Sequence, residues 1–212
     1  MNSESLIAGL GASRLLAIIR GSDPEACFRT AMTLVEEGFT HLEVSLNSAD
    51  AAMVISRLRR ETEGRARIGA GTVLTVDDVH RVADAGAEFI VTPASGPSLR
   101  TAVALELPVL AGALTPSEAY GAMSDGASAV KLFPASLGGP VYLAALRDPF
   151  PDVPFIPVGG VDEAVAPEYL RRGALAVGVG SPLIGDAAAG GSLDTLRARA
   201  QGFLAAVRGI SS

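Results

Sequence analysis

The stretch Ala129-Val130-Lys131-Leu132-Phe133-Pro134 belongs to one of eight short apolar runs that recur along the 212-residue chain. Helical patterns separate the runs, which lie about 20 to 25 residues apart, as expected for alternating strands and helices. Near-continuous apolar strands between helices indicate a parallel sheet that is covered on both faces. The predicted strands are Leu15–Arg20, His41–Leu46, Arg67–Val73, Phe89–Ala94, Pro108–Leu114, Ala129–Ala135, Val153–Gly160 and Ala174–Gly180.

The segments between the strands carry signals for the start and end of helices. Each start pairs a capping residue with an acidic first turn, and several segments end in a glycine that accepts a left-handed conformation. The starts are Asp23-Pro24-Glu25, Thr75-Val76-Asp77-Asp78, Thr115-Pro116-Ser117-Glu118 and Asp162-Glu163, and the glycines are Gly38, Gly86, Gly126 and Gly173.

Eight strand–helix units in one chain predict a (β/α)₈ TIM barrel, with residues 1–212 forming a single domain. A doubly wound open sheet is the competing architecture. It favours a Gly-x-Gly-x-x-Gly turn after the first strand, whereas Arg20-Gly21-Ser22-Asp23 follows here. The barrel is therefore the prediction.

Composition excludes several classes of function. The net charge of −6 and the pI of about 4.9 argue against nucleic acid or an anionic membrane as a partner. Cys27 is the single cysteine, and His41 and His80 lack metal-ligand spacing, so we expect neither a disulfide framework nor a metal site. With no secretory signal and no apolar run of membrane length, a cytoplasmic protein without a cofactor is expected.

Lys131 is the only lysine, beside sixteen arginines. Arginine serves as surface charge, but only lysine can lose a proton near neutral pH and attack a carbonyl as a free amine. Its position among Val130, Leu132 and Phe133 makes Lys131 a candidate for Schiff-base formation. The alternative is an ordinary lysine at a strand end whose charged group reaches out to solvent.

Polar residues at the carboxyl ends of barrel strands form active sites. The first strand ends in Arg20, the third in Gly71-Thr72, and the second carries Glu43 and Asn47 on one face. A carboxylate inside a strand is costly unless it is paired or functional. Glu43 is therefore either a general acid/base near Lys131 or a structural ion-pair partner of Arg20 or Lys131.

The last two strands end in glycine-rich loops. Gly159-Gly160-Val161 precedes a predicted helix at Asp162, and Gly180-Ser181 is followed by another helical turn. Glycine lets backbone N–H groups approach an oxyanion, and these are the loops where many barrels bind phosphate. Together, the residues favour imine chemistry on a phosphorylated keto acid over metal-assisted chemistry.

At these residues the chain resembles the Schiff-base aldolases that cleave 2-keto-3-deoxy-6-phospho sugar acids, the KDPG/KHG aldolase family. The resemblance covers nearly the whole chain. It implies catalysis by Lys131 and Glu43, binding of the pyruvyl carboxylate by Thr72 and Arg20, a homotrimer, and a small-molecule substrate. The matching motifs are Glu43-Val44-Ser45-Leu46-Asn47-Ser48, Ile68-Gly69-Ala70-Gly71-Thr72-Val73-Leu74, Val130-Lys131-Leu132-Phe133-Pro134-Ala135 and Val158-Gly159-Gly160-Val161.

Two positions bear on the substrate. The phosphogluconate branch has an arginine where this chain has Asn47, and a threonine where it has Val158. Both resemble the branch that acts on 2-dehydro-3-deoxy-6-phosphogalactonate, the C4 epimer, so they are the predicted specificity residues. A phosphogluconate or 4-hydroxy-2-oxoglutarate aldolase is the alternative within the family. A phosphosugar-binding barrel without aldolase activity is the alternative outside it.

Two further residues have open roles. Phe133 is predicted either to form a wall of the site or to lie in the core, and Pro93 is predicted to be structural.

Overall fold

The computed structural model describes residues 2–62 and 64–210 and confirms the (β/α)₈ barrel. The predicted domain, 1–212, includes positions 1, 63, 211 and 212, which lie outside the described residues. The parallel strands follow the order β7-β6-β5-β4-β3-β2-β1-β8. Their bounds are β1 Leu15–Ile19, β2 His41–Ser45, β3 Arg67–Gly71, β4 Ile90–Val91, β5 Val109–Ala113, β6 Ala129–Leu132, β7 Phe155–Pro157 and β8 Val177–Val179.

The barrel closes between β7 and β8 by few contacts. Val158 and Gly178 form an isolated parallel bridge, and the Leu175 N–H donates to the Phe155 carbonyl at 2.9 Å. The other neighbouring strands pair in register, for example Lys131 with Gly112 on β5 and Ile156 on β7. This seam is the least paired part of the barrel wall. The loops predicted to bind phosphate follow the two strands that form it.

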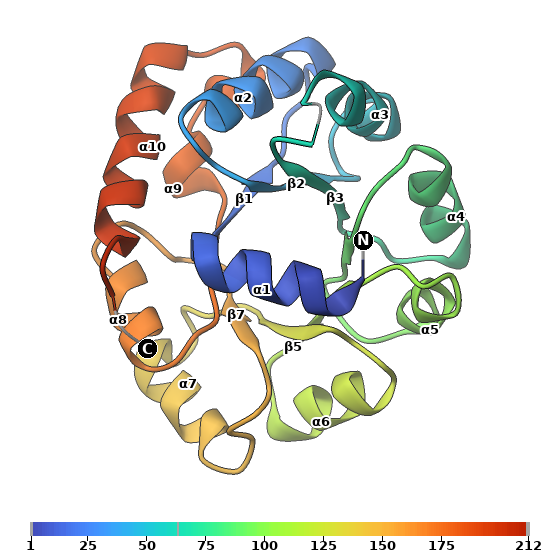
Figure 1. Cartoon of the computed structure of the whole chain (residues 1–212), viewed down its shortest axis with the longest axis vertical. Helices are drawn as coiled ribbons and strands as arrows, with labels where there is room; N and C mark the ends of the chain where they lie inside the picture. Colours follow the sequence, from blue (N-terminus) through green and yellow to red (C-terminus); the bar gives the residue numbers. More distant parts are fainter. Residues whose placement is uncertain (1, 63, 211–212) are drawn as a thin grey trace.

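Helices surround the strands (Figure 1). Three of the predicted helix starts are confirmed. The side chains of Asp23, Thr75 and Thr115 cap α2, α4 and α6. The predicted start at Asp162-Glu163 is wrong: Asp162 caps a turn by accepting from the N–H groups of Ala164 and Val165, and α8 begins later. The helices of this ring are α2 Pro24–Glu36, α3 Ala51–Glu61, α4 Val76–Asp84, α5 Pro97–Ala104, α6 Pro116–Ser124, α7 Gly139–Arg147, α8 Ala166–Arg171, α9 Ser181–Ile184 and α10 Leu193–Val207, with a 3₁₀ turn at Ala187–Ala189.

The predicted glycines after the helices all have positive φ. The angles are 105° at Gly38, 85° at Gly86, 95° at Gly126 and 84° at Gly173. At these positions a side chain would strain the backbone, which is why glycine marks the helix ends in the sequence.

Helix α1 (Ser3–Ser13), which the sequence did not reveal, crosses one end of the barrel (Figure 1). Its Leu6 and Leu10 are fully buried against interior side chains of the strands. The Ser3 hydroxyl lies 2.8 Å from that of Ser128, the residue before β6. The helix therefore closes the amino-terminal end of the barrel.

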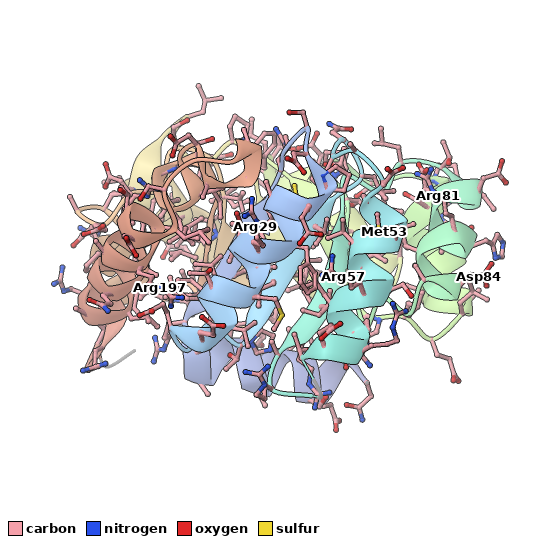
Figure 2. All side chains as sticks on the ribbon, turned by 90° about the horizontal axis from the view of Figure 1, so that it is seen from above. Arg29, Met53, Arg57, Arg81, Asp84 and Arg197 are labelled. Carbon is pink, nitrogen blue, oxygen red and sulfur yellow. The ribbon has the colours of Figure 1, made fainter. Side chains whose placement is uncertain are left out.

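Arginines on the surrounding helices point outwards (Figure 2). Arg57 pairs with Glu25 and lies over the Phe28 ring, 3.5 Å from its centroid. Arg197 pairs with Glu36 and Glu37 at 2.8 and 2.7 Å. These guanidinium groups link neighbouring helices at the surface, apart from the barrel interior.

Across residues 2–62 and 64–210, no helix is both long enough and apolar enough to cross a membrane.

Candidate active site

A cleft of about 700 Å³ lies at the carboxyl ends of the strands. It brings together every predicted site residue except Glu43, although those residues come from β1, β2, β3, β6, β7 and β8 or the loops after them. The lining residues are Ile18, Arg20, Asn47, Thr72, Pro93, Lys131, Phe133, Val158, Gly159, Gly160, Val161, Gly178, Gly180, Ser181, Pro182, Ile184 and Gly185.

Lys131 is buried within β6, with 8% of its surface exposed. Its Nζ lies 5.5 Å from the centroid of the Phe133 ring, which forms a wall of the cleft. The low exposure is unlike that of a lysine whose head reaches bulk solvent, the alternative that the sequence left open. An amine held here is shielded from water yet accessible to a molecule in the cleft.

Glu43 is buried beside the cleft, in the middle of β2. A Cβ atom built on Gly71 would lie 1.6 Å from Glu43 Oε1, so the carboxyl occupies space that only a glycine leaves free. Among the described residues, Glu43 Oε2 has no hydrogen-bond partner, and Glu43 forms no ion pair with Arg20 or Lys131. The structure thus lacks the structural salt bridge that was the alternative to a catalytic carboxyl.

Burial raises the pKa of the Glu43 carboxyl, and the positive charges of Lys131 and then Arg20 partly offset this effect. A carboxyl with a raised pKa exchanges protons more readily near neutral pH than an ordinary glutamate does. The combination of an unpartnered oxygen and two cations within electrostatic reach suits a group that moves protons during a reaction.

The glycine loops after β7 and β8 form one side of the cleft. Gly159 and Gly160 have φ of 94° and 76°, and a Cβ on Gly160 would lie 2.8 Å from the Ser136 side chain. Helix α9 begins at Ser181 beside the cleft; Pro182 has no N–H, and Leu183 and Ile184 donate to the Gly180 carbonyl, so among the described residues of this helix only the Ser181 N–H is left for a ligand. Free backbone donors and close approach of the main chain are what an oxyanion such as phosphate requires.

Thr72 and Asn47 line the cleft at the ends of β3 and β2. Thr72 has a φ of 58°, which is unusual for a β-branched residue. Its hydroxyl lies 2.9 Å from that of Ser45.

Sequence reasoning missed several lining residues. Ile18 lies two positions before Arg20, so strand alternation could have identified it. Pro182, Ile184 and Gly185 belong to or follow α9, which the sequence indicated only as a helical turn. Pro93, predicted to be structural, also lines the cleft, because the chain after β4 passes close above Gly112.

The two histidines and the cysteine have no place in the cleft lining. His41 is buried at the opposite end of β2, where burial lowers its pKa to about 4. Its Nδ1 lies 3.0 Å from the Thr40 hydroxyl. Within the described part of the chain, no three histidine, cysteine, aspartate or glutamate side chains are grouped to hold a metal ion.

Comparison with known proteins identifies the family. A family model described as "KDPG and KHG aldolase" matches residues 6–195. A probable 2-dehydro-3-deoxy-6-phosphogalactonate aldolase from Rhizobium meliloti is 39% identical over 80% of this chain and 81% of its own. The chain belongs to the KDPG and KHG aldolase family. It is an aldolase, a carbon–carbon lyase.

Other relatives of this aldolase share its fold but are named for different substrates. A solved structure described as "Native KDPGal structure" has a TM-score of 0.86 and 34% identity, covering 92% of this chain and 94% of its own. A 2-dehydro-3-deoxy-phosphogluconate aldolase from Pseudomonas aeruginosa is 39% identical over 74% of this chain and 72% of its own. Overall sequence identity to these relatives therefore does not indicate which of the two substrates this enzyme cleaves.

Gly71→Ala tests the placement of Glu43 in this aldolase. The added methyl would displace the carboxyl, and a shift of about 1 Å can lower a rate by about 10²-fold. We expect kcat/KM to fall by about that factor while circular dichroism shows a folded barrel. Gly121→Ala is the matched control, because a Cβ there meets no atom within 4 Å. Near-normal activity of folded Gly71→Ala would show that activity does not depend on this position of the Glu43 carboxyl.

Proposed function

We propose that this aldolase cleaves 2-dehydro-3-deoxy-6-phosphogalactonate into pyruvate and D-glyceraldehyde 3-phosphate through a Schiff base on Lys131. The single observation that carries the proposal is the position of Lys131, the chain's only lysine. It is buried in the cleft within electrostatic reach of the buried Glu43 carboxyl. An amine and a proton-transfer group so placed suit covalent catalysis on a ketone.

The reaction begins when neutral Lys131 Nζ attacks the C2 ketone of the substrate. Loss of water from the carbinolamine gives a cationic imine. This imine is the electron acceptor for the next step, in which the C3–C4 bond breaks and its electrons form an enamine. Glyceraldehyde 3-phosphate leaves, the enamine is protonated at C3, and hydrolysis of the imine releases pyruvate and restores Lys131.

Glu43 moves the protons in this scheme. As the carboxylate it removes the proton from the C4 hydroxyl during bond cleavage, directly or through a water molecule. As the acid it assists loss of water from the carbinolamine. The raised pKa of Glu43 supports both roles, because each protonation state is then accessible closer to neutral pH.

The cleft would bind both anionic groups of the substrate. Thr72 and Arg20 are placed to bind the carboxylate next to C2. The loops at Gly159–Val161 and Gly180-Ser181 are placed to hold the phosphate, which would orient the bond to be broken.

Borohydride reduction in the presence of pyruvate tests the imine. We expect one reduced adduct per chain, mapped by mass spectrometry to the peptide that contains Lys131. Lys131→Arg, which keeps the positive charge but has no attacking amine, is the matched control and should give no adduct on this peptide. Absence of the adduct from the unchanged protein would rule out the Schiff base.

The choice between the C4 epimers rests on Val158 and Asn47. Val158 is 6% exposed and lies in the cleft wall between β7 and β8. A Cβ on Gly178 would lie 2.5 Å from Val158 Cγ2, so the glycine makes room for a branched side chain at 158. Valine offers no hydrogen bond to a substrate hydroxyl there, whereas threonine of the same shape would.

Comparison of kcat/KM on the two epimers tests this assignment. We expect the unchanged enzyme to prefer the galactonate-derived substrate, and Val158→Thr to shift the ratio towards the gluconate-derived one by about tenfold. A hydrogen bond to a hydroxyl is typically worth about 1–3 kcal/mol of discrimination. Val103→Thr, on the outer helix α5, is the matched control. A preference of the unchanged enzyme for the gluconate-derived epimer would overturn the substrate assignment.

We propose in addition that the enzyme is a homotrimer, as its family resemblance implies. Large apolar side chains are exposed on α6, on α7 and in the loop before α7: Tyr120 is 65% exposed, Leu137 64% and Val141 68%. Such groups favour contact with another copy of the chain. Light scattering should give three times the chain mass of 21.5 kDa, and a monomer mass at micromolar concentration would contradict the proposal.

A further inference from the structure

Ser45 is the last residue of β2 and is completely buried. It pairs in register with Gly71 and follows Glu43 on the same face of the strand. Its hydroxyl oxygen lies 2.9 Å from Thr72 Oγ1, and the structure gives it no other partner among the described residues. Among the described residues, Ser45 is therefore linked by a side-chain hydrogen bond to the cleft lining through Thr72.

Thr72 requires such support because its backbone is in the left-handed region, with a φ of 58°. A β-branched residue adopts this conformation only where neighbouring contacts hold it. The backbone on either side is fixed, since the Leu46 N–H donates to the Gly71 carbonyl and the Val73 N–H to the Val91 carbonyl. The Ser45 hydroxyl is the hydrogen-bond partner of the Thr72 side chain among the described residues.

A hydroxyl group carries one proton, so the direction of this hydrogen bond matters. If Thr72 donated to Ser45, it would have no proton left for an anion in the cleft. If Ser45 donates, Thr72 accepts and its own proton is free. A buried Ser45 without another acceptor favours the second arrangement, and a carboxylate that accepts from Thr72 would strengthen both hydrogen bonds.

We propose that Ser45 is a positioning residue: it donates to Thr72 Oγ1, so that Thr72 presents its proton to the carboxylate of the 2-keto acid. This inference rests on the proposed function, in which that carboxylate lies at Thr72. Ser45 itself touches no substrate. Its loss should weaken binding of the keto-acid end while leaving the amine of Lys131 able to react.

Borohydride trapping on Lys131 measures this effect with two ligands. Pyruvate has the carboxylate, whereas hydroxyacetone is a neutral ketone that lacks it. For Ser45→Ala, we expect the half-saturating concentration of pyruvate to rise about 5- to 30-fold and that of hydroxyacetone to stay within about twofold, because the Thr72 hydroxyl would be less well oriented for its charge-assisted hydrogen bond to the carboxylate. Ser45→Thr, which keeps the donor, should restore pyruvate trapping.

Thr72→Val provides the second half of a double-mutant cycle. It keeps the shape of the side chain but removes the hydroxyl, so adding Ser45→Ala to it should weaken pyruvate trapping no further. If Ser45→Ala does not fold, Ser45→Cys replaces it, because cysteine is similar in size but a weaker donor.

Three results would count against the inference. Unchanged pyruvate trapping in Ser45→Ala would show that Ser45 has no such role. Equal weakening for pyruvate and hydroxyacetone would show a general structural role instead. Absence of a pyruvate adduct in the unchanged enzyme would overturn the proposed function itself, and this inference with it.

Discussion

The buried carboxyl of Glu43 is the constraint on which the active site depends. A carboxyl in the barrel wall needs space, and Gly71 on the neighbouring strand supplies it by having no side chain. It also lacks the partners that buried polar groups usually have, since Oε2 forms no hydrogen bond with the described residues. Burial raises the pKa of Glu43, and the positive charges of Lys131 on β6 and of Arg20 after β1 limit that rise.

The positions of the residues around Glu43 are set by the same pairing of β2 with β3. Parallel register sets Glu43 beside Gly69 and Ser45 beside Gly71, so the inward residues of β2 face the end of β3. There the chain turns through Thr72 in the left-handed region. One strand pair thus carries both the group proposed to move protons and the group proposed to bind the carboxylate, at a separation fixed by the backbone.

Much of this arrangement could be predicted because it depends on local signals. Apolar runs, capping residues and terminal glycines each act within a few residues, and they gave the eight strands and most helix ends. Lys131 was identifiable because it is the only lysine, and strand alternation placed Glu43 on the face of Asn47. The predicted helix start at Asp162 failed because the same capping contacts also form a turn, and here that turn leads into α8 only at Ala166.

Other features depend on contacts between distant segments, so the sequence could not reveal them. The requirement for Gly71 appears only when β2 and β3 are side by side, and the role of Gly178 only when β7 meets β8. Helix α1 lies outside the repeating strand–helix pattern, although Leu6 and Leu10 are four residues apart on one face.

Arginine and lysine have different roles in this protein because they lie in different parts of the structure. Arginine on the outer helices forms planar, multiple contacts with carboxylates, as Arg197 does with Glu36 and Glu37. Those contacts stabilise packing and require a permanent charge. Inside the cleft a permanent charge beside a ketone could attract an anion but could not form a bond to carbon. Lys131 is therefore the one basic residue whose replacement by arginine would keep the charge of the site and remove the proposed chemistry.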